Sequence, residues 1–197
     1  MSSVSVILAS IWSIPIASIL GLRNFPGKRL LKGTFNALIG IPTVALGLFF
    51  YLLLSRSGPL GFLGALYKPE GIIIGQAVLI TPIIVSFAAT AIESIDPDIR
   101  NLARTLGATN TRVSITILRE ASGPVLQSVV AGFNRAIAEL GVAMMLGGNI
   151  RYVSRVLTTT IALETAKGEI ALSLALAIIL LAIVYCFSIG LSFLRGE

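Results

Sequence analysis

Two charged side chains interrupt the apolar stretch at residues 124–146, where they could pair or line a path for ions. Arg135 and Glu139 stand four residues apart, so on a helix they share one face and can pair. If the stretch crosses a membrane, an unpaired Arg at its centre would cost about 2.5 to 3.5 kcal/mol on insertion scales. Two interpretations remain open: a self-neutralising structural pair, or a hydrated cavity for an anion to which Asn134 also contributes.

A second polar cluster follows this stretch and combines guanidinium groups with hydroxyls. Its members are Arg151, Arg155, Thr158, Thr159, Thr160, Glu164 and Thr165. Such groups suit weak, multi-point contact with an anion that must be passed along and not trapped. Contact with another protein, or a plain solvated helix, explains the cluster equally well.

Several kinds of chemistry are excluded by residues that the sequence lacks. It contains no His, and Cys186, its single Cys, lies within the last apolar run, so we expect no metal site and no disulfide. Nothing matches the phosphate-binding pattern Gly-x4-Gly-Lys-Ser/Thr. Glu139 alone is a poor catalytic set, which disfavours an intramembrane enzyme. We therefore expect no catalytic residues in this chain.

Apolar helices must position these polar groups. Hydrophobic residues make up 55% of the 197 and charged residues 12%, against about 25% charged in a soluble domain. We predict an all-α, polytopic membrane protein with a single domain over residues 1–197. Helices of about 20 residues cross the bilayer, so the apolar runs predict five spans, at residues 4–22, 34–54, 71–92, 124–146 and 170–194. Pro15, Pro42 and Pro82 fall in mid-span and predict kinks.

The basic residues predict the orientation of the chain. Nine of the 15 Lys and Arg fall after the first, third and fifth spans, and five fall on the opposite side. The positive-inside rule then places those loops and the C-terminus in the cytoplasm, and the protein in the plasma membrane. The net charge of +6 is explained by this topology, so we expect no nucleic-acid partner.

The predicted cytoplasmic loop at residues 93–123 contains a short amphipathic helix over residues 96–107. Asp96 suits the N-cap, Pro97 the first turn, and Gly107 a left-handed stop. Apolar residues recur at helical spacing on one face: Ile99, Leu102, Ala103 and Leu106. From periodicity alone, a helix lying among lipid headgroups and a helix docked in a partner's groove are equally good interpretations.

This loop resembles the so-called EAA loop of ABC-type importer permeases. The family pattern is Glu-Ala-Ala, three residues, Gly, nine residues, Ile, one residue and Leu-Pro. Ala103, Gly107 and Ile117 match it, whereas Asn101 and Leu102 stand at the Glu and first Ala positions. The departures leave the amphipathic helix intact. The resemblance implies that Ile99, Asn101, Leu102, Ala103, Leu106, Gly107 and Ile117 couple the chain to an ATPase.

Further segments, at residues 23–29, 55–61, 118–121, 132–141, 147–150 and 155–165, are similar to the membrane subunit of tungstate-type importers, with molybdate importers as near relatives. The resemblance implies a type I ABC importer permease whose N-terminus is shortened. It also implies a homodimer, ABC ATPase subunits that carry ATP and Mg²⁺, an extracytoplasmic oxyanion-binding protein, and no cofactor in this chain. Small residues in the fourth span fit either a second copy or an intrachain contact.

The expected function is therefore ATP-driven import of an oxyanion by alternating access. Tungstate is the expected substrate, and molybdate or another small anion is the alternative. The permeation path would be lined by Asn134, Arg135, Glu139, Thr158 and Thr159. A passive channel or a membrane scaffold is the alternative from a different class.

Overall fold

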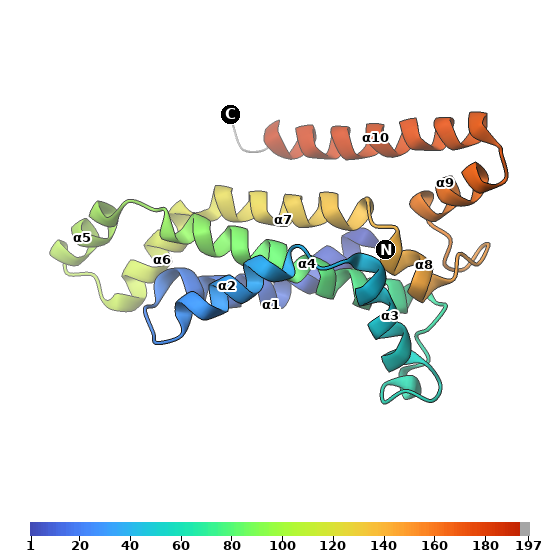
Figure 1. The fold of residues 1–197 in the computed structure, drawn as a ribbon. Coiled ribbons are helices and arrows are strands. Elements are labelled where there is room, and N and C mark those ends of the chain that lie inside the picture. Colours follow the sequence, from blue (N-terminus) through green and yellow to red (C-terminus); the bar gives the residue numbers. More distant parts are fainter. Residues whose placement is uncertain (194–197) are drawn as a thin grey trace.

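The computed structural model describes residues 1–193, and all regular structure in that part of the chain is helical (Figure 1). Three helices are long and apolar enough to cross a membrane: α1 (Ser2–Leu22), α4 (Pro69–Glu93) and α10 (Ile170–Phe193). Two bent helix pairs bring the number of possible spans to five. The predicted all-α membrane fold is confirmed. Leu194 and Arg195, the predicted end of the last span and its basic flank, lie outside the described residues.

The core is a bundle of α1, α4 and α7 (Ser122–Ile137). Val6 of α1 packs with Ala77 of α4 near one end, and Ala17 packs with Ala88 near the other, so these two helices run in the same direction. Helix α7 runs the opposite way. A β-carbon added at Gly132 of α7 would lie 2.9 Å from the Ile84 side chain. This close intrachain approach accounts for a small residue in α7.

The second predicted span, residues 34–54, is not one continuous helix. The chain instead forms α2 (Lys28–Leu38) and α3 (Thr43–Leu54), whose axes differ by 99°. Pro42 has no amide hydrogen and disfavours helical conformation at Ile41, and Gly40 adds flexibility just before them. Pro42 therefore directly precedes α3 and does not kink a continuous helix, whereas Pro15 and Pro82 do lie inside α1 and α4.

The fourth predicted span, residues 124–146, is also broken. Helix α7 ends at Ile137, and α8 (Gly141–Gly147) continues at an angle of 58°. The break lets α8 pack against α3: a β-carbon at Gly141 would lie 2.6 Å from Thr43 Oγ1, and one at Gly47 would lie 2.9 Å from Met145 Cβ. The fourth predicted span is therefore a bent pair of helices, and its second helix packs closely on α3.

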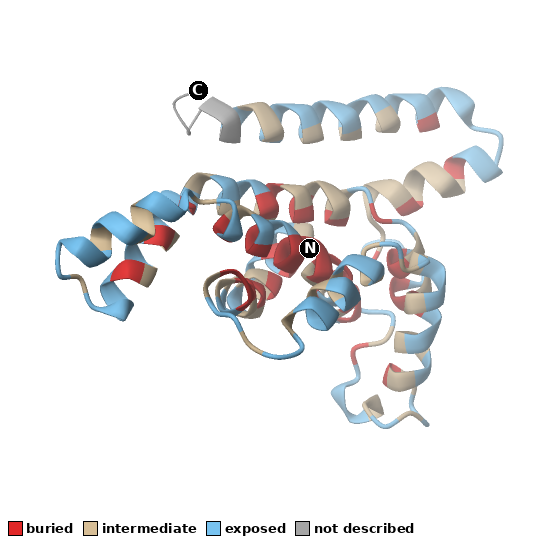
Figure 2. Cartoon of the chain, turned by 60° about the vertical axis from the view of Figure 1, so that its left-hand side comes forward, coloured by how far each residue is buried: buried red, intermediate tan, exposed pale blue. Residues whose placement is uncertain are grey.

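The remaining elements lie at the two ends of the bundle (Figure 1). Helices α5 (Pro97–Thr105) and α6 (Asn110–Glu120) form a hairpin at what we call the α5 end. At the opposite, α8 end lie η1 (Gly61–Leu63) and α9 (Leu157–Ala166). Helix α10 returns along α7 but is little buried: 6% of its most apolar window, against 72% for α4. Figure 2 shows its exposed surface.

Candidate functional site

The hairpin at the α5 end is built from local capping signals. Asp96 Oδ1 accepts a hydrogen bond from the Asp98 amide at 2.9 Å, which caps the start of α5. Gly107 has φ +79°, a conformation that glycine adopts without steric cost, and it follows the end of α5. Thr109 Oγ1 accepts from the Arg112 amide and caps α6. The hairpin is thus fixed by its own sequence.

The apolar face of α5 is largely without a partner among the described residues. Leu102 is 62% exposed and Leu106 is 79% exposed, while Ile99 and Ala103 are half-buried. Asn101 is exposed beside them. In Figure 2 the hairpin projects from the bundle with most of α5 in the exposed colour. Two adjacent exposed aliphatic side chains are typical of a surface that contacts another molecule.

Ile117, the last residue of the predicted coupling set, lies elsewhere. It is 3% exposed and packs with Ile92 of α4, Val113 and Ala121. Ala103 of α5 contacts the same cluster. Ile117 therefore anchors the hairpin to the ends of α4 and α7 and is not part of the exposed face.

Arg135 and Glu139 form an ion pair, with Arg135 Nη1 2.6 Å from Glu139 Oε2. Glu139 is 2% exposed, and its other oxygen, Oε1, accepts a hydrogen bond from the Val142 amide at 3.0 Å. Its backbone carbonyl accepts from Thr158 Oγ1 at 2.9 Å. Both carboxylate oxygens are thus engaged where α7 breaks into α8, and the side chain supplies an acceptor to the first turn of α8. This geometry favours a structural role for the pair.

A cavity of about 680 Å³ lies beside this break, at the α8 end. Its polar lining comes from segments far apart in the sequence: Gln76, Glu139, Arg151, Arg155, Thr158 and Thr160. Two guanidinium groups face one carboxylate that Arg135 already neutralises. The cavity is therefore suited to an anion.

The guanidinium of Arg155 is held in place at this cavity. Its Nε donates to Asn149 Oδ1 at 3.1 Å, and its Nη2 donates to the Asn149 carbonyl at 3.2 Å. Arg151 lies over the exposed ring of Tyr152, 4.8 Å from the ring centroid. One cation is thus pre-oriented and the other is held more loosely, an arrangement suited to an anion that is not to be enclosed.

Deep polar contacts tie the cavity to the bundle. Gln76 of α4 is 2% exposed; its Nε2 donates to the Ala136 carbonyl at 3.0 Å, and its Oε1 accepts from Ser5 Oγ at 3.1 Å. These bonds join α1, α4 and the last turn of α7 at one level. Any tilt of α7 must therefore change the wall of the cavity.

The structure brings only part of the predicted path together. Glu139 and Thr158 line the cavity, but Asn134 exchanges hydrogen bonds with Ser188 of α10. Thr159 is fully buried and caps α9 by accepting from the Val156 amide at 3.0 Å. The predicted path omitted Gln76, Arg151 and Arg155. Both Arg had been placed in the polar cluster suited to an anion, but the sequence did not indicate that they meet Glu139 and Thr158.

Comparison with known proteins identifies this architecture. Residues 13–195 match the family described as binding-protein-dependent transport system inner membrane component. The chain belongs to this family. Membership agrees with the apolar helices of the bundle.

Individual permeases match over most of the chain. A probable anion ABC transporter permease of Haloferax volcanii is 37% identical, over 93% of this chain and 82% of its own. A tungstate uptake system permease of Peptoclostridium acidaminophilum is 36% identical, over 100% of this chain and 86% of its own. A molybdenum transport system permease of Haemophilus influenzae is 34% identical, over 75% of this chain and 70% of its own. The chain is thus an ABC permease whose relatives handle oxyanions, tungstate among them.

Proposed function

We propose that this permease is the membrane subunit of an ATP-driven importer for a tetrahedral oxyanion, with tungstate preferred over molybdate. A separate ATPase docks on α5 from the cytoplasm, and a binding protein delivers the anion at the α8 end. The observation that carries this function is the exposed pair Leu102 and Leu106, on a hairpin anchored to the bundle. The full-length similarity to permeases for anions and tungstate supports the substrate class.

The hairpin can pass a push from the ATPase into the bundle. Only Ala121 separates α6 from α7, so the two helices follow one another without a loop. Ile117 packs on Ile92, near the end of α4. A displacement of α5 would therefore reach α4 and α7 through packed side chains. We infer that closure of the ATPase dimer tilts these helices and switches the cavity between its two openings.

The cavity at the α8 end would receive the anion. Arg155 is pre-oriented by Asn149, and Arg151 lines the same cavity. The charge of Glu139 is compensated by Arg135, so it does not repel an oxyanion as an isolated carboxylate would. Few, mobile contacts favour release as well as entry. We therefore place the start of the path here and assign the Arg135–Glu139 pair to holding the helix break.

Reconstitution tests this function directly. The permease, its ATPase and its binding protein are placed in proteoliposomes, and uptake of labelled tungstate is followed with and without ATP. We expect uptake only with ATP, and stronger competition by unlabelled tungstate than by molybdate. Uptake that continues without ATP would establish a passive channel instead. No uptake of either oxyanion, with ATP hydrolysis intact, would refute the substrate class.

A further inference from the structure

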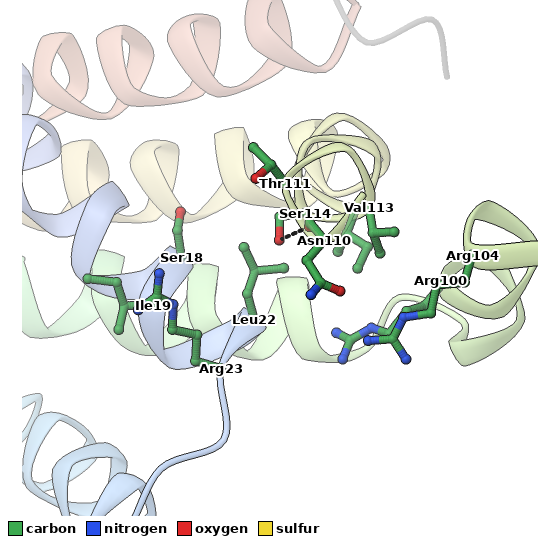
Figure 3. A pocket seen from close by; sticks show the side chains of 11 residues that line it. Ser18, Ile19, Leu22, Arg23, Arg100, Arg104, Asn110, Thr111, Val113 and Ser114 are labelled. Carbon is green, nitrogen blue, oxygen red and sulfur yellow. Dashed lines mark hydrogen bonds between the residues drawn. The ribbon is translucent and has the colours of Figure 1, made fainter. Parts of the chain in front are cut away.

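A second pocket, of about 520 Å³, lies at the α5 end, away from the cavity described above. It is formed where the last turn of α1 meets the hairpin of α5 and α6 (Figure 3). Its floor is apolar, with Ile19, Leu22, Val113 and Ile117, and its rim is polar. Neither the docking face nor the proposed path uses it.

The rim carries three positive charges and no carboxylate. Arg23, Arg100 and Arg104 line the pocket, and none of them forms an ion pair among the described residues. Figure 3 shows Arg100 and Arg104 extending from α5 in the same direction. Like charges four residues apart weaken a helix unless something neutralises them. The basic residues of α2 differ, since Lys28 and Lys32 both pair with Glu93.

The start of α6 adds hydrogen-bond donors on the same side. Asn110 and Thr111, its first two residues, line the pocket, whereas the Ser114 hydroxyl, which also lines it, already donates to the Asn110 carbonyl. First-turn amides of a helix have no intrahelical partner, and the helix dipole makes this end positive. Backbone donors beside guanidinium groups form the chemistry that binds phosphate-like groups.

We propose that this pocket binds one tetrahedral oxyanion group, held by Arg23, Arg100 and Arg104 together with the first turn of α6. The group comes either from a phospholipid headgroup or from a free oxyanion. The bound group bridges the end of α1 to the hairpin that carries the docking face. It thereby sets how freely α5 moves relative to the bundle.

A neighbouring groove makes the two sources distinguishable. It holds about 330 Å³, shares Ser18 with the pocket, and runs between α1 and α7 along mainly apolar residues, among them Ile14, Val125 and Leu126. A phospholipid would place its phosphate in the pocket and an acyl chain in this groove. A free oxyanion would use the pocket alone.

The test uses the full chain, purified in detergent and stripped of lipid. Three probes are offered separately: sodium phosphate and sodium tungstate, followed by calorimetry, and phosphatidylglycerol, followed by native mass spectrometry. The variants are R100Q/R104Q on α5 and R23Q on α1. The matched control is R112Q/R119Q, which removes two exposed charges of α6 that do not line the pocket.

At this pocket we expect saturable binding of one probe class with a stoichiometry of one, separate from any tungstate that enters the cavity at the α8 end. R100Q/R104Q should weaken it about tenfold or more, because each lost contact is a charge-assisted hydrogen bond. R23Q should weaken it in the same direction, and R112Q/R119Q should bind as wild type. Tight phosphatidylglycerol binding with no response to phosphate or tungstate identifies a lipid site, and the reverse identifies a free-oxyanion site.

Equal binding of every probe by wild type and R100Q/R104Q would overturn the assignment. So would an equal loss in R112Q/R119Q, because the basic surface as a whole would then be responsible. Thermal unfolding of each variant shows whether it is folded. Because R23Q changes a different helix, it provides an independent answer if R100Q/R104Q unfolds.

Discussion

Leu106 provides the sharpest test of the docking face. Its side chain is 79% exposed, so truncation removes little that stabilises the fold. Leu106→Ala deletes three carbons, each contributing about 0.8 kcal/mol when buried. Scaled by the exposed fraction of 79%, the lost docking free energy is about 1.9 kcal/mol, or about 20-fold in the Kd of the ATPase.

Leu106→Glu should have a larger effect. A carboxylate carried into an apolar groove loses its hydration, and the effective penalty is several kcal/mol for an unpaired ion. We expect docking to weaken by about 100-fold or more. ATP-driven uptake should then be lost, although the permease still inserts into the membrane, because residue 106 lies in a loop that is not part of any predicted span.

The assay measures binding of the ATPase to the permease in lipid nanodiscs, and then uptake in proteoliposomes. Ile115→Ala is the matched control, since Ile115 is also aliphatic and 47% exposed but lies on α6. We expect this control to bind the ATPase as wild type. If Leu106→Ala and Leu106→Glu both bind within twofold of wild type, α5 is not the docking element and the reasoning from its exposed face is refuted.

Three further predictions concern the bundle and the cavity at the α8 end. Arg135→Ala leaves the buried Glu139 carboxylate unpaired and should destabilise the fold by about 3 kcal/mol or more. Replacing both residues by Gln should destabilise the fold less, and thermal unfolding in detergent measures both variants. Gly132→Ala should lower the free energy of unfolding by about 1 to 3 kcal/mol, because the new β-carbon would lie 2.9 Å from a neighbouring side chain. Gly33→Ala on α2 has open space around it and should raise the free energy of unfolding by about 0.5 kcal/mol in the same experiment. Arg155→Gln should raise the tungstate concentration needed for half-maximal uptake and leave ATPase binding unchanged; unaltered uptake would count against the proposed entrance.

The sequence was most informative where the signal is local. The α5 helix was predicted from Asp96, Pro97 and Gly107, and the structure has α5 at Pro97–Thr105. Its cap and its left-handed glycine depend only on neighbouring residues, and its apolar face follows from helical spacing. The long apolar helices α1, α4 and α10 were predicted for the same reason, because a continuous apolar run needs no distant partner to be recognised.

The break between α7 and α8 could not be predicted, because it depends on contacts between distant segments, whereas Gly40 and Pro42 mark the break between α2 and α3 locally. The chain breaks after Ile137 so that Gly141 can pack on Thr43, about a hundred residues earlier, and so that Glu139 can accept from the Val142 amide. Hydropathy averages over such breaks. The cavity has the same origin, since it joins Gln76 to Arg155 across the fold. Composition indicated which residues could bind an anion but not which of them meet.

Helix α10 is long and has few contacts with the rest of the chain, unlike the helices of the bundle. It contains 24 residues and is therefore about 36 Å long, a few ångströms more than the hydrocarbon thickness of about 30 Å. With 6% of its apolar window buried in the chain, few protein contacts oppose a change in its angle. Its tilt will therefore follow bilayer thickness. Since α9 connects α10 to the cavity, lipid chain length becomes a physical variable that acts on the α8 end of this permease.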